Sequence, residues 1–261
     1  MNVSDNPHQN YLLDSLPNIE YERLKPYLEP IPMILGEVVY ESGDTLNYLY
    51  FPTTCIVSML YVMENGASAE IAVVGNEGII GVALFMGGGS VPNRAVVQST
   101  GYAYRMRKSH FMKEFERSGP LLRVSLRYTQ ALICQMGQTA VCNRHHSIDQ
   151  QLCRWLLLSL DRLPSNTLAM TQELIANMLG VRREGVTEAA LKLQKAGLIN
   201  YTRGRITVLD RPGLEDRVCE CYQVVKTETD RLFSYPDPSQ IFKTDENSEV
   251  NLNLTQRDIA S

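Results

Sequence analysis

The chain has 261 residues, enough for one large domain or two of ordinary size. Hydrophobic residues make up 44% and charged residues 21%, which excludes a wholly disordered, collagen-like or disulfide-stapled chain. The net charge is −4, yet residues 119–213 contain 12 basic and 6 acidic residues and so carry a net charge of +6. A basic block inside an acidic chain is the charge distribution expected of an appended module that contacts nucleic acid.

Nothing in the hydrophobic pattern predicts a membrane segment. The uncharged stretches at residues 78–93 and 128–143 cover 16 positions each and are broken by Gly or polar residues, whereas a spanning helix needs roughly 20 apolar residues. Residues 1–30 lack the basic and then apolar pattern of an export signal. We therefore expect a soluble, cytoplasmic protein with no membrane contact, whose cysteines are reduced and mostly packed as small hydrophobic residues.

Short segments rich in β-branched and aromatic residues follow one another between residues 37 and 106. Glu64-Asn65-Gly66 separates two of them, and Asn-Gly favours the positive φ angles of a tight hairpin. Several strands at such intervals predict a small β-barrel or roll. The expected strands are residues 38–40, 48–51, 55–62, 67–74, 94–98 and 102–106.

The hydrophobic period changes to that of a helix over residues 118–143. The residues on one face of this helix recur at alternating steps of four and three, which is the spacing of a seam between two helices. The helix could simply lie on its own barrel, but Leu121, Leu132 and Val141 supply a second apolar flank for that purpose, so a homodimer seam is favoured. The predicted seam comprises Leu122, Leu126, Thr129, Ile133, Met136 and Ala140, and continues to Asn143.

Residues 146–162 predict a further helix, with Leu152, Trp155, Leu156 and Leu160 on one face. Two more helices and a hairpin follow. Thr171 is placed to cap the first of them, Gly180 to supply a left-handed turn, and Gly197 to close the second. The expected buried positions are Leu174, Ile175 and Met178 in the first helix and Val186, Ala190 and Leu193 in the second.

Residues 200–208 then form a hairpin with Arg203-Gly204-Arg205 at its tip, which completes a winged helix-turn-helix. A helix that enters the major groove must present polar side chains near its N-terminus. Arg can bond guanine O6 and N7 together, Glu can accept from cytosine, and arginines on the wing suit phosphate oxygens. The alternative is a helical hairpin with a solvated charged face. It is less favoured because the Gly turn, the helical period and the wing each indicate a winged helix-turn-helix independently. The expected DNA contacts are Thr171, Gln172, Arg182, Arg183, Glu184, Thr187, Glu188, Lys192, Arg203 and Arg205.

The order barrel, long helix, winged helix-turn-helix resembles the Crp/Fnr family of bacterial transcription regulators over about residues 20–212. Glu41-Ser42-Gly43-Asp44 and Tyr50-Phe51 resemble the opening barrel strands, and Gly-Val-Arg-Arg-Glu-Gly-Val-Thr-Glu (180–188) resembles the start of the recognition helix. The resemblance implies that Arg183 and Glu184 read a G·C step. Glu188 departs from the family, where Arg is usual, so the usual half-site sequence does not carry over.

The resemblance also implies an α+β fold: a cyclic-nucleotide-binding-like β-roll sensor domain at residues 1–117, a dimerisation helix at 118–145 and a winged helix-turn-helix at 146–213. A C-terminal helix at 214–233, from Leu214 to Phe233, and a disordered acidic tail at 234–261 complete the expected layout.

The same resemblance locates a candidate effector site. Arg94-Ala95 fits the family's phosphate-binding Arg-Ser/Ala, and Thr139 falls where a relative's Thr contacts the base. Val82 replaces the expected Glu after Gly81, and Ala140 replaces a polar residue, so Arg94 could equally be a structural residue of the Gly-rich loop. We expect no cofactor, with cyclic-nucleotide binding as the alternative; the candidate effector contacts are Gly81, Arg94, Ala95 and Thr139.

The cysteines admit two further interpretations. Cys142, His145, His146 and Cys153 could gather a metal at a helix junction, but helical spacing explains them more simply as packing and polar surface, so no metal site is predicted. Cys219 and Cys221 could sense oxidants or pair across a dimer, but packing of the C-terminal helix is the favoured interpretation.

These observations predict a non-enzymatic regulator that binds double-stranded DNA as a homodimer on a two-fold symmetric operator, with RNA polymerase as a further candidate partner. Its sensor domain would shift the long-helix seam in response to an effector that the sequence does not name; constitutive action is equally open. The rival hypothesis is a ligand- or redox-sensing module whose helix-turn-helix mediates protein contacts. An enzyme is the weakest alternative, because no acid/base pair or nucleophile constellation stands out.

Overall fold

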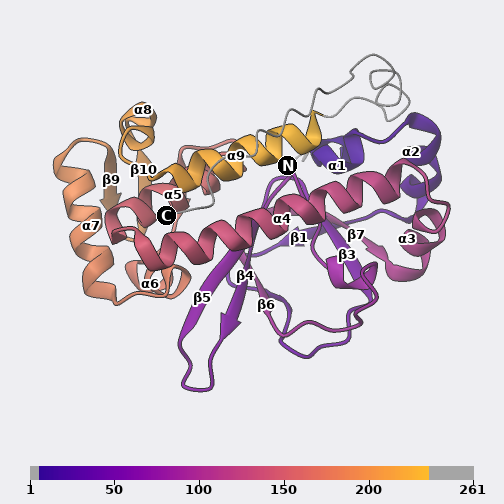
Figure 1. The fold of residues 1–261 in the computed structure, drawn as a ribbon, viewed down its shortest axis with the longest axis horizontal. Coiled ribbons are helices and arrows are strands. Elements are labelled where there is room, and N and C mark those ends of the chain that lie inside the picture. Colours follow the sequence, from indigo (N-terminus) through magenta and orange to yellow (C-terminus); the bar gives the residue numbers. More distant parts are fainter. Residues whose placement is uncertain (1–5, 235–261) are drawn as a thin grey trace, which may run out of the picture.

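The computed structural model describes residues 6–234 and has the expected α+β fold. Its longest element is helix α4 (Pro120–His145), which runs across the molecule between a β-roll and a winged helix-turn-helix (Figure 1). Two short helices, α1 (Tyr11–Asp14) and α2 (Asn18–Leu24), precede the roll, and a third, α3 (Lys108–Phe115), follows it. Single 3-10 turns lie at Pro7–Gln9, Lys25–Tyr27 and Val82–Leu84.

The roll consists of two antiparallel sheets. One has the strand order β1-β7-β3 and the other β2-β6-β4-β5, and a bridge between Tyr50 and Ile80 joins the first sheet to the loop after β5. The strands are β1 (Glu29–Met33), β2 (Val38–Tyr40), β3 (Tyr48–Pro52), β4 (Ile56–Val62), β5 (Ser68–Val74), β6 (Arg94–Ser99) and β7 (Gly101–Arg107).

All six predicted strands of the roll are present, with ends that differ by one residue or not at all. Strand β1 was missed because Pro30 and Pro32 interrupt its pattern. It is an edge strand that pairs only with β7, so the N–H groups that proline lacks are not needed for a second ladder. The β4–β5 hairpin is confirmed, but only Gly66 of the Asn-Gly pair has a positive φ, +82°. A longer loop, closed by Met63 N–H donating to the Ala67 carbonyl, replaces the expected two-residue turn.

Helix α4 buries one face against the roll and exposes another. Leu121 and Leu132 are buried in the core of the roll, as expected, but Val141 is 49% exposed, so it does not belong to that flank. Of the predicted seam, Leu126 and Ile133 are exposed, at 51% and 60%, whereas Thr129 is buried and donates its hydroxyl hydrogen to the Ser125 carbonyl. The exposed face therefore keeps Leu126, Ile133 and Ala140 of the predicted seam and adds Val141, whereas Leu122 and Met136 pack against the core of the roll.

Helix α5 (Ile148–Leu160) joins the two halves of the molecule. A capping box at Ser147 and Gln150 starts it, and every residue from Gln151 to Leu160 is buried. Its side chains share one apolar core with Ile56, Leu60 and Val73 of the roll. The helix-turn-helix thus packs directly on the second sheet of the roll instead of being tethered by a linker.

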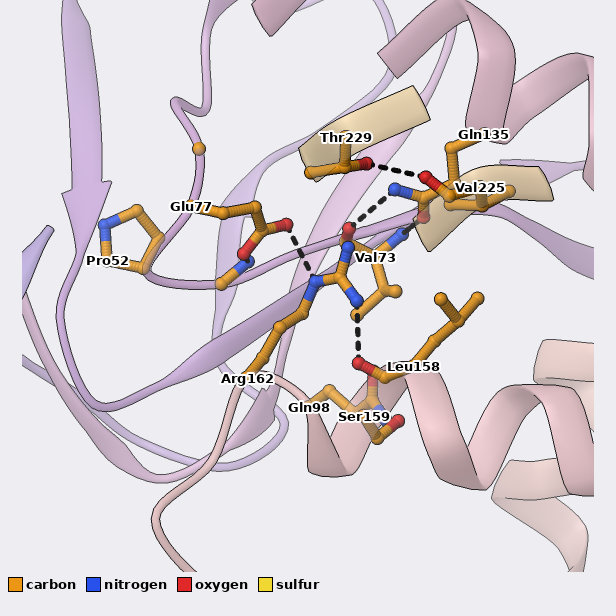
Figure 2. A network of polar contacts seen from close by, with 12 residues as sticks. Pro52, Val73, Glu77, Gln98, Gln135, Leu158, Ser159, Arg162, Val225 and Thr229 are labelled. Atoms are coloured by element: carbon orange, nitrogen blue, oxygen red, sulfur yellow. Dashed lines mark hydrogen bonds and ion pairs between the residues drawn. The ribbon is translucent and has the colours of Figure 1, made fainter. Parts of the chain in front are cut away.

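Polar contacts cross the same interface (Figure 2). The Arg162 guanidinium donates from Nε to Glu77 Oε1 at 2.6 Å and from NH1 to the Leu158 carbonyl. Gln135 of α4 accepts from Val73 N–H at 2.7 Å and donates to the Val73 carbonyl. Because these side chains are buried, removing one partner would leave a desolvated group unpaired.

Glu70 of β5 lies in this interface with too few hydrogen bonds and charge partners to offset the burial of its carboxyl group. Its side chain is buried, its Oε2 has no hydrogen-bond partner among the described residues, and burial raises its pKa from 4.5 to about 7 despite nearby Ser58, Arg154 and Arg162. The folded protein therefore binds this proton more tightly than the unfolded chain does. The resulting stabilisation is complete below pH 4.5 and is lost as the pH rises toward 7.

We expect Glu70→Gln, which stays neutral at all pH values, to be more stable than the wild type at pH 8, by up to about 3 kcal/mol. At pH 4.5 the two proteins should differ little. Urea denaturation at both pH values measures this; an identical difference at the two would show that Glu70 does not titrate near neutrality.

The C-terminal part differs from the single helix predicted for residues 214–233. Two helices form, α8 (Arg211–Glu215), capped by Asp210, and α9 (Glu220–Phe233), which begins after Cys219 and packs along α4. Pro212 is the second residue of α8, and the break at residues 216–219 lets α9 turn back along α4 (Figure 1). The tail prediction for residues 235–261 lies outside the described residues.

Candidate nucleic-acid interface

The helix-turn-helix is built from α6 (Gln172–Leu179) and α7 (Arg183–Lys195). Gly180 links them with φ +66°, the left-handed value that the turn was predicted to need, and Thr171 caps α6 by accepting from Leu174 N–H. The buried face of α7 is the predicted one. The stripe on α6 is corrected: Leu174 is 38% exposed, and the buried residues are Ile175, Ala176, Met178 and Leu179.

The wing is a three-stranded sheet of order β8-β10-β9, formed by β8 (Thr167–Ala169), β9 (Ile199–Thr202) and β10 (Arg205–Val208). Strand β8 was not predicted because only Thr167 of its three residues is β-branched or aromatic, whereas all three residues of the equally short β2 are. Arg203 and Gly204 both have positive φ, 49° and 73°, and this pair forms the tight turn between β9 and β10. The Gly204 carbonyl accepts from Met170 N–H, so the wing tip is held beside the start of α6.

A hollow of about 440 Å³ opens between the start of α6, the start of α7 and the wing tip. Tyr201 and Glu173, which the sequence analysis did not single out, lie in its wall. Burial raises the pKa of Tyr201, and the positive charge of Arg183, which borders the same hollow, opposes that rise. The lining residues are Thr171, Gln172, Glu173, Arg183, Tyr201, Arg203 and Gly204.

The remaining predicted contacts are distributed unequally. Arg182 at the N-cap of α7, Glu184 and Glu188 within it, and Arg205 of β10 are exposed. Thr187 is half-buried and donates to Gln172 Oε1 at 2.8 Å, so this pair also holds α6 against α7. Lys192 forms an ion pair with Asp149 of α5 at 3.2 Å. Exposed charged side chains thus lie at both ends of α7, with Arg183 and Glu184 at its start and Lys192 and Lys195 in its last turn.

The four candidate effector contacts are engaged in separate interactions. Arg94 pairs with Glu41 at 3.2 Å, and Ala95 is buried within the second sheet. Gly81 has φ +100° beside the Tyr48 carbonyl. The Thr139 hydroxyl donates to the Gln135 carbonyl and accepts from Arg154 of α5 at 3.1 Å. No hydrogen bond or ion pair recorded among residues 6–234 joins these four positions.

No helix within the described part of the chain combines the length and apolarity that crossing a bilayer requires.

A β-roll joined through a long helix to a winged helix-turn-helix defines a class: a transcriptional regulator that combines a cyclic nucleotide-binding-like domain with a helix-turn-helix DNA-binding domain. Residues 35–118 match the cyclic nucleotide-binding domain family, and residues 150–217 match the Crp-like helix-turn-helix domain family. Together the two matches span more than half of the chain, which belongs to the Crp/Fnr family of transcriptional regulators.

Solved structures show the same fold. A Crp/Fnr family regulator from Eubacterium rectale is 16% identical, with a TM-score of 0.63 over 83% of this chain and 99% of that one. FixK2 from Bradyrhizobium japonicum is 17% identical, with a TM-score of 0.62 over 74% and 98%. The c-di-GMP-responsive regulator CLP from Xanthomonas campestris is 15% identical, with a TM-score of 0.59 over 74% and 99%. No curated protein matches the sequence significantly.

Proposed function

We propose that this regulator acts in the cytoplasm as a homodimer on a two-fold symmetric operator, with α7 of each copy in successive major grooves. The observation that carries the proposal is the arrangement of Arg183 and Arg203. One lies on the first turn of α7 and the other on the wing tip, and both border one open hollow. A helix end that presents Arg and Glu suits base edges, and an exposed wing arginine suits the neighbouring phosphates.

The exposed face of α4 supports the dimer. Leu126, Ile133 and Val141 are about half exposed in the single chain, and Gly137 between them has open space where a side chain would be. A second α4 could approach closely along this face and bury three apolar side chains from each copy. Pairing there would leave the opposite face of α4 packed on the roll.

The direct contact between roll and α5 supports a route for regulation. A change in the roll would reach the helix-turn-helix through Glu77 and Gln98, which contact Arg162 and Ser159, and would reach the long helix α4 through Val73, which contacts Gln135. Since Arg94 is paired with Glu41 and Thr139 with Arg154, a cyclic nucleotide is not the favoured effector. RNA polymerase is the partner through which such a regulator would act on transcription.

The rival function is that of a sensor whose helix-turn-helix contacts proteins. The salt dependence of DNA binding distinguishes it from the proposed function. We expect affinity for duplex DNA to fall steeply and log-linearly with ionic strength, since Lys and Arg displace counterions from phosphates. Two chains should bind per duplex, as measured by sedimentation. Absence of DNA binding at low salt would favour the rival.

Arg183→Ala is expected to lose discrimination at one G·C position of each half-site by about 1–3 kcal/mol, or about 5- to 150-fold. The measurement is competition between the preferred duplex and one substituted at that base pair. Unchanged preference would show that Arg183 does not read a base.

Arg203→Ala is the matched contrast, because it removes the same side chain from the other wall of the hollow. It should weaken binding to all sequences alike. The slope of log affinity against log salt concentration should become shallower by about one. A changed base preference in this variant would reverse the two assignments.

A further inference from the structure

Four metal-ligating side chains meet where α4 ends and α9 begins: Cys142, His146, Cys219 and Cys221. Their donor atoms all lie within 4.8 Å of one another, and the three cysteines are buried. Of the grouping considered from sequence, Cys142 and His146 belong to this cluster. His145 is exposed, and Cys153 packs in the apolar core of the helix-turn-helix.

Local structure explains how the four groups converge. Cys142 and His146 are one helical turn apart at the end of α4, so they project from the same side of it. Cys219 is the N-cap residue of α9 and Cys221 lies within its first turn. Helix α9 runs back along α4, with Gln130 bonded to Glu228 and Gln138 to Cys221, and this packing brings the two pairs together.

The distances suit one tetrahedral ion. The Sγ atoms of Cys142 and Cys219 are 3.6 Å apart, and Cys221 Sγ lies 3.4 Å from His146 Nδ1. With Zn–S near 2.3 Å and Zn–N near 2.05 Å, tetrahedral ligands would be separated by about 3.8 Å for two sulfurs and about 3.6 Å for sulfur and nitrogen.

The surroundings are those of a metal site. His146 faces Cys221 with Nδ1, and its other ring nitrogen, Nε2, lies 3.3 Å from the Glu220 carboxylate. Metal-bound histidines are typically oriented by a carboxylate in this way. Gln138 Nε2 donates to Cys221 Sγ at 3.1 Å, which stabilises negative charge on that sulfur.

The buried guanidinium of Arg154 supplies a positive charge near the cluster. Arg154 is 4% exposed, its Nε has no hydrogen-bond partner among the described residues, and its charge acts on both Cys142 and Glu70. Three thiolates and a neutral imidazole around a divalent ion carry a net charge of −1. That charge would compensate a guanidinium that is otherwise costly to bury.

We propose that Cys142, His146, Cys219 and Cys221 form a structural binding site for one thiophilic divalent cation, best matched by Zn²⁺. Three sulfurs and one imidazole exclude Mg²⁺ and Ca²⁺ as preferred ions, since those take oxygen ligands. The ion would fasten α9 to α4 and so close a loop that contains the whole helix-turn-helix. Its loading would fix the DNA-binding domain against the long helix.

The test is an anaerobic Co²⁺ titration of the full-length protein, stripped of metal and kept reduced with a phosphine. We expect one equivalent of Co²⁺ to give the visible bands of tetrahedral coordination and the near-ultraviolet band of thiolate-to-cobalt charge transfer, both removed by Zn²⁺. Cys219→Ser should abolish the charge-transfer spectrum or weaken Co²⁺ binding at least 100-fold. Cys134→Ser, a control on α4 outside the cluster, should bind as the wild type does.

Glu220→Gln provides a milder variant if Cys219→Ser does not fold. It leaves all four ligands in place and should weaken Co²⁺ affinity by about 10- to 100-fold through the orientation of His146. Co²⁺ binding without a thiolate band, equal binding by the wild type and Cys219→Ser, or no binding would each overturn the proposal. So would a reduced protein that binds no ion but joins Cys142 to Cys219 on oxidation, because the cluster would then be a disulfide switch.

Discussion

Arg162→Ala is expected to lower the free energy of unfolding by about 3–5 kcal/mol, because it leaves the Glu77 carboxylate buried without its partner. The two side chains are only 7% and 12% exposed, and the Arg162 stem also fills the space beside Gly75, where an added Cβ would lie 2.7 Å from it. Urea denaturation at pH 7 measures the loss. Because the pair joins the roll to the loop after α5, the variant should also show faster proteolysis between the two domains.

The matched control removes both charges. Glu77→Gln combined with Arg162→Met keeps most of the volume and leaves no unpaired ion, so it should recover more than half of the stability lost in Arg162→Ala. A loss below about 1 kcal/mol in Arg162→Ala, or no recovery in the double variant, would show that the ion pair does not hold the interface.

Ile133→Glu is expected to dissociate the dimer and to weaken binding to a two-half-site duplex by about 30- to 1,000-fold, equivalent to about 2–4 kcal/mol. The side chain is 60% exposed in the single chain, so the change should leave each copy folded. In a symmetric α4 pair, however, it would place two carboxylates in the apolar seam. Sedimentation equilibrium and DNA titration measure the two effects.

Ile19→Glu on α2 introduces the same charge at an isoleucine that is 74% exposed and lies off α4. It should behave as the wild type in both measurements. Equal loss in the two variants, or a dimeric Ile133→Glu protein, would place the contact between copies somewhere other than this face.

Local signals in the sequence predicted most of the fold. The Gly180 turn, the Thr171 cap and the tight turn at Arg203 and Gly204 depend on a few neighbouring residues, and all three are present. Strand β1 was missed because prolines interrupt its pattern, and β8 because Leu168 and Ala169 are neither β-branched nor aromatic. Pairing with β7 and β10 supplies the stability of these two strands.

Contacts between distant segments account for the errors. Val141 and Leu174 are exposed because the packing of α4 and α6 on their neighbours selects a face slightly rotated from the one that periodicity indicates. The partners of Thr139 and Arg94 could not be inferred from a motif, since Arg154 and Glu41 reach them only in the folded chain. The cysteine cluster likewise joins positions 77 residues apart, which neither helical spacing nor a short motif can indicate.

Selection of bound duplexes from a random DNA pool tests the central claim most directly. The account predicts a two-fold symmetric motif whose half-sites are about one helical turn apart, because two α7 helices would occupy successive major grooves. An asymmetric single site, or recovery of DNA without any shared sequence, would contradict paired recognition through α7.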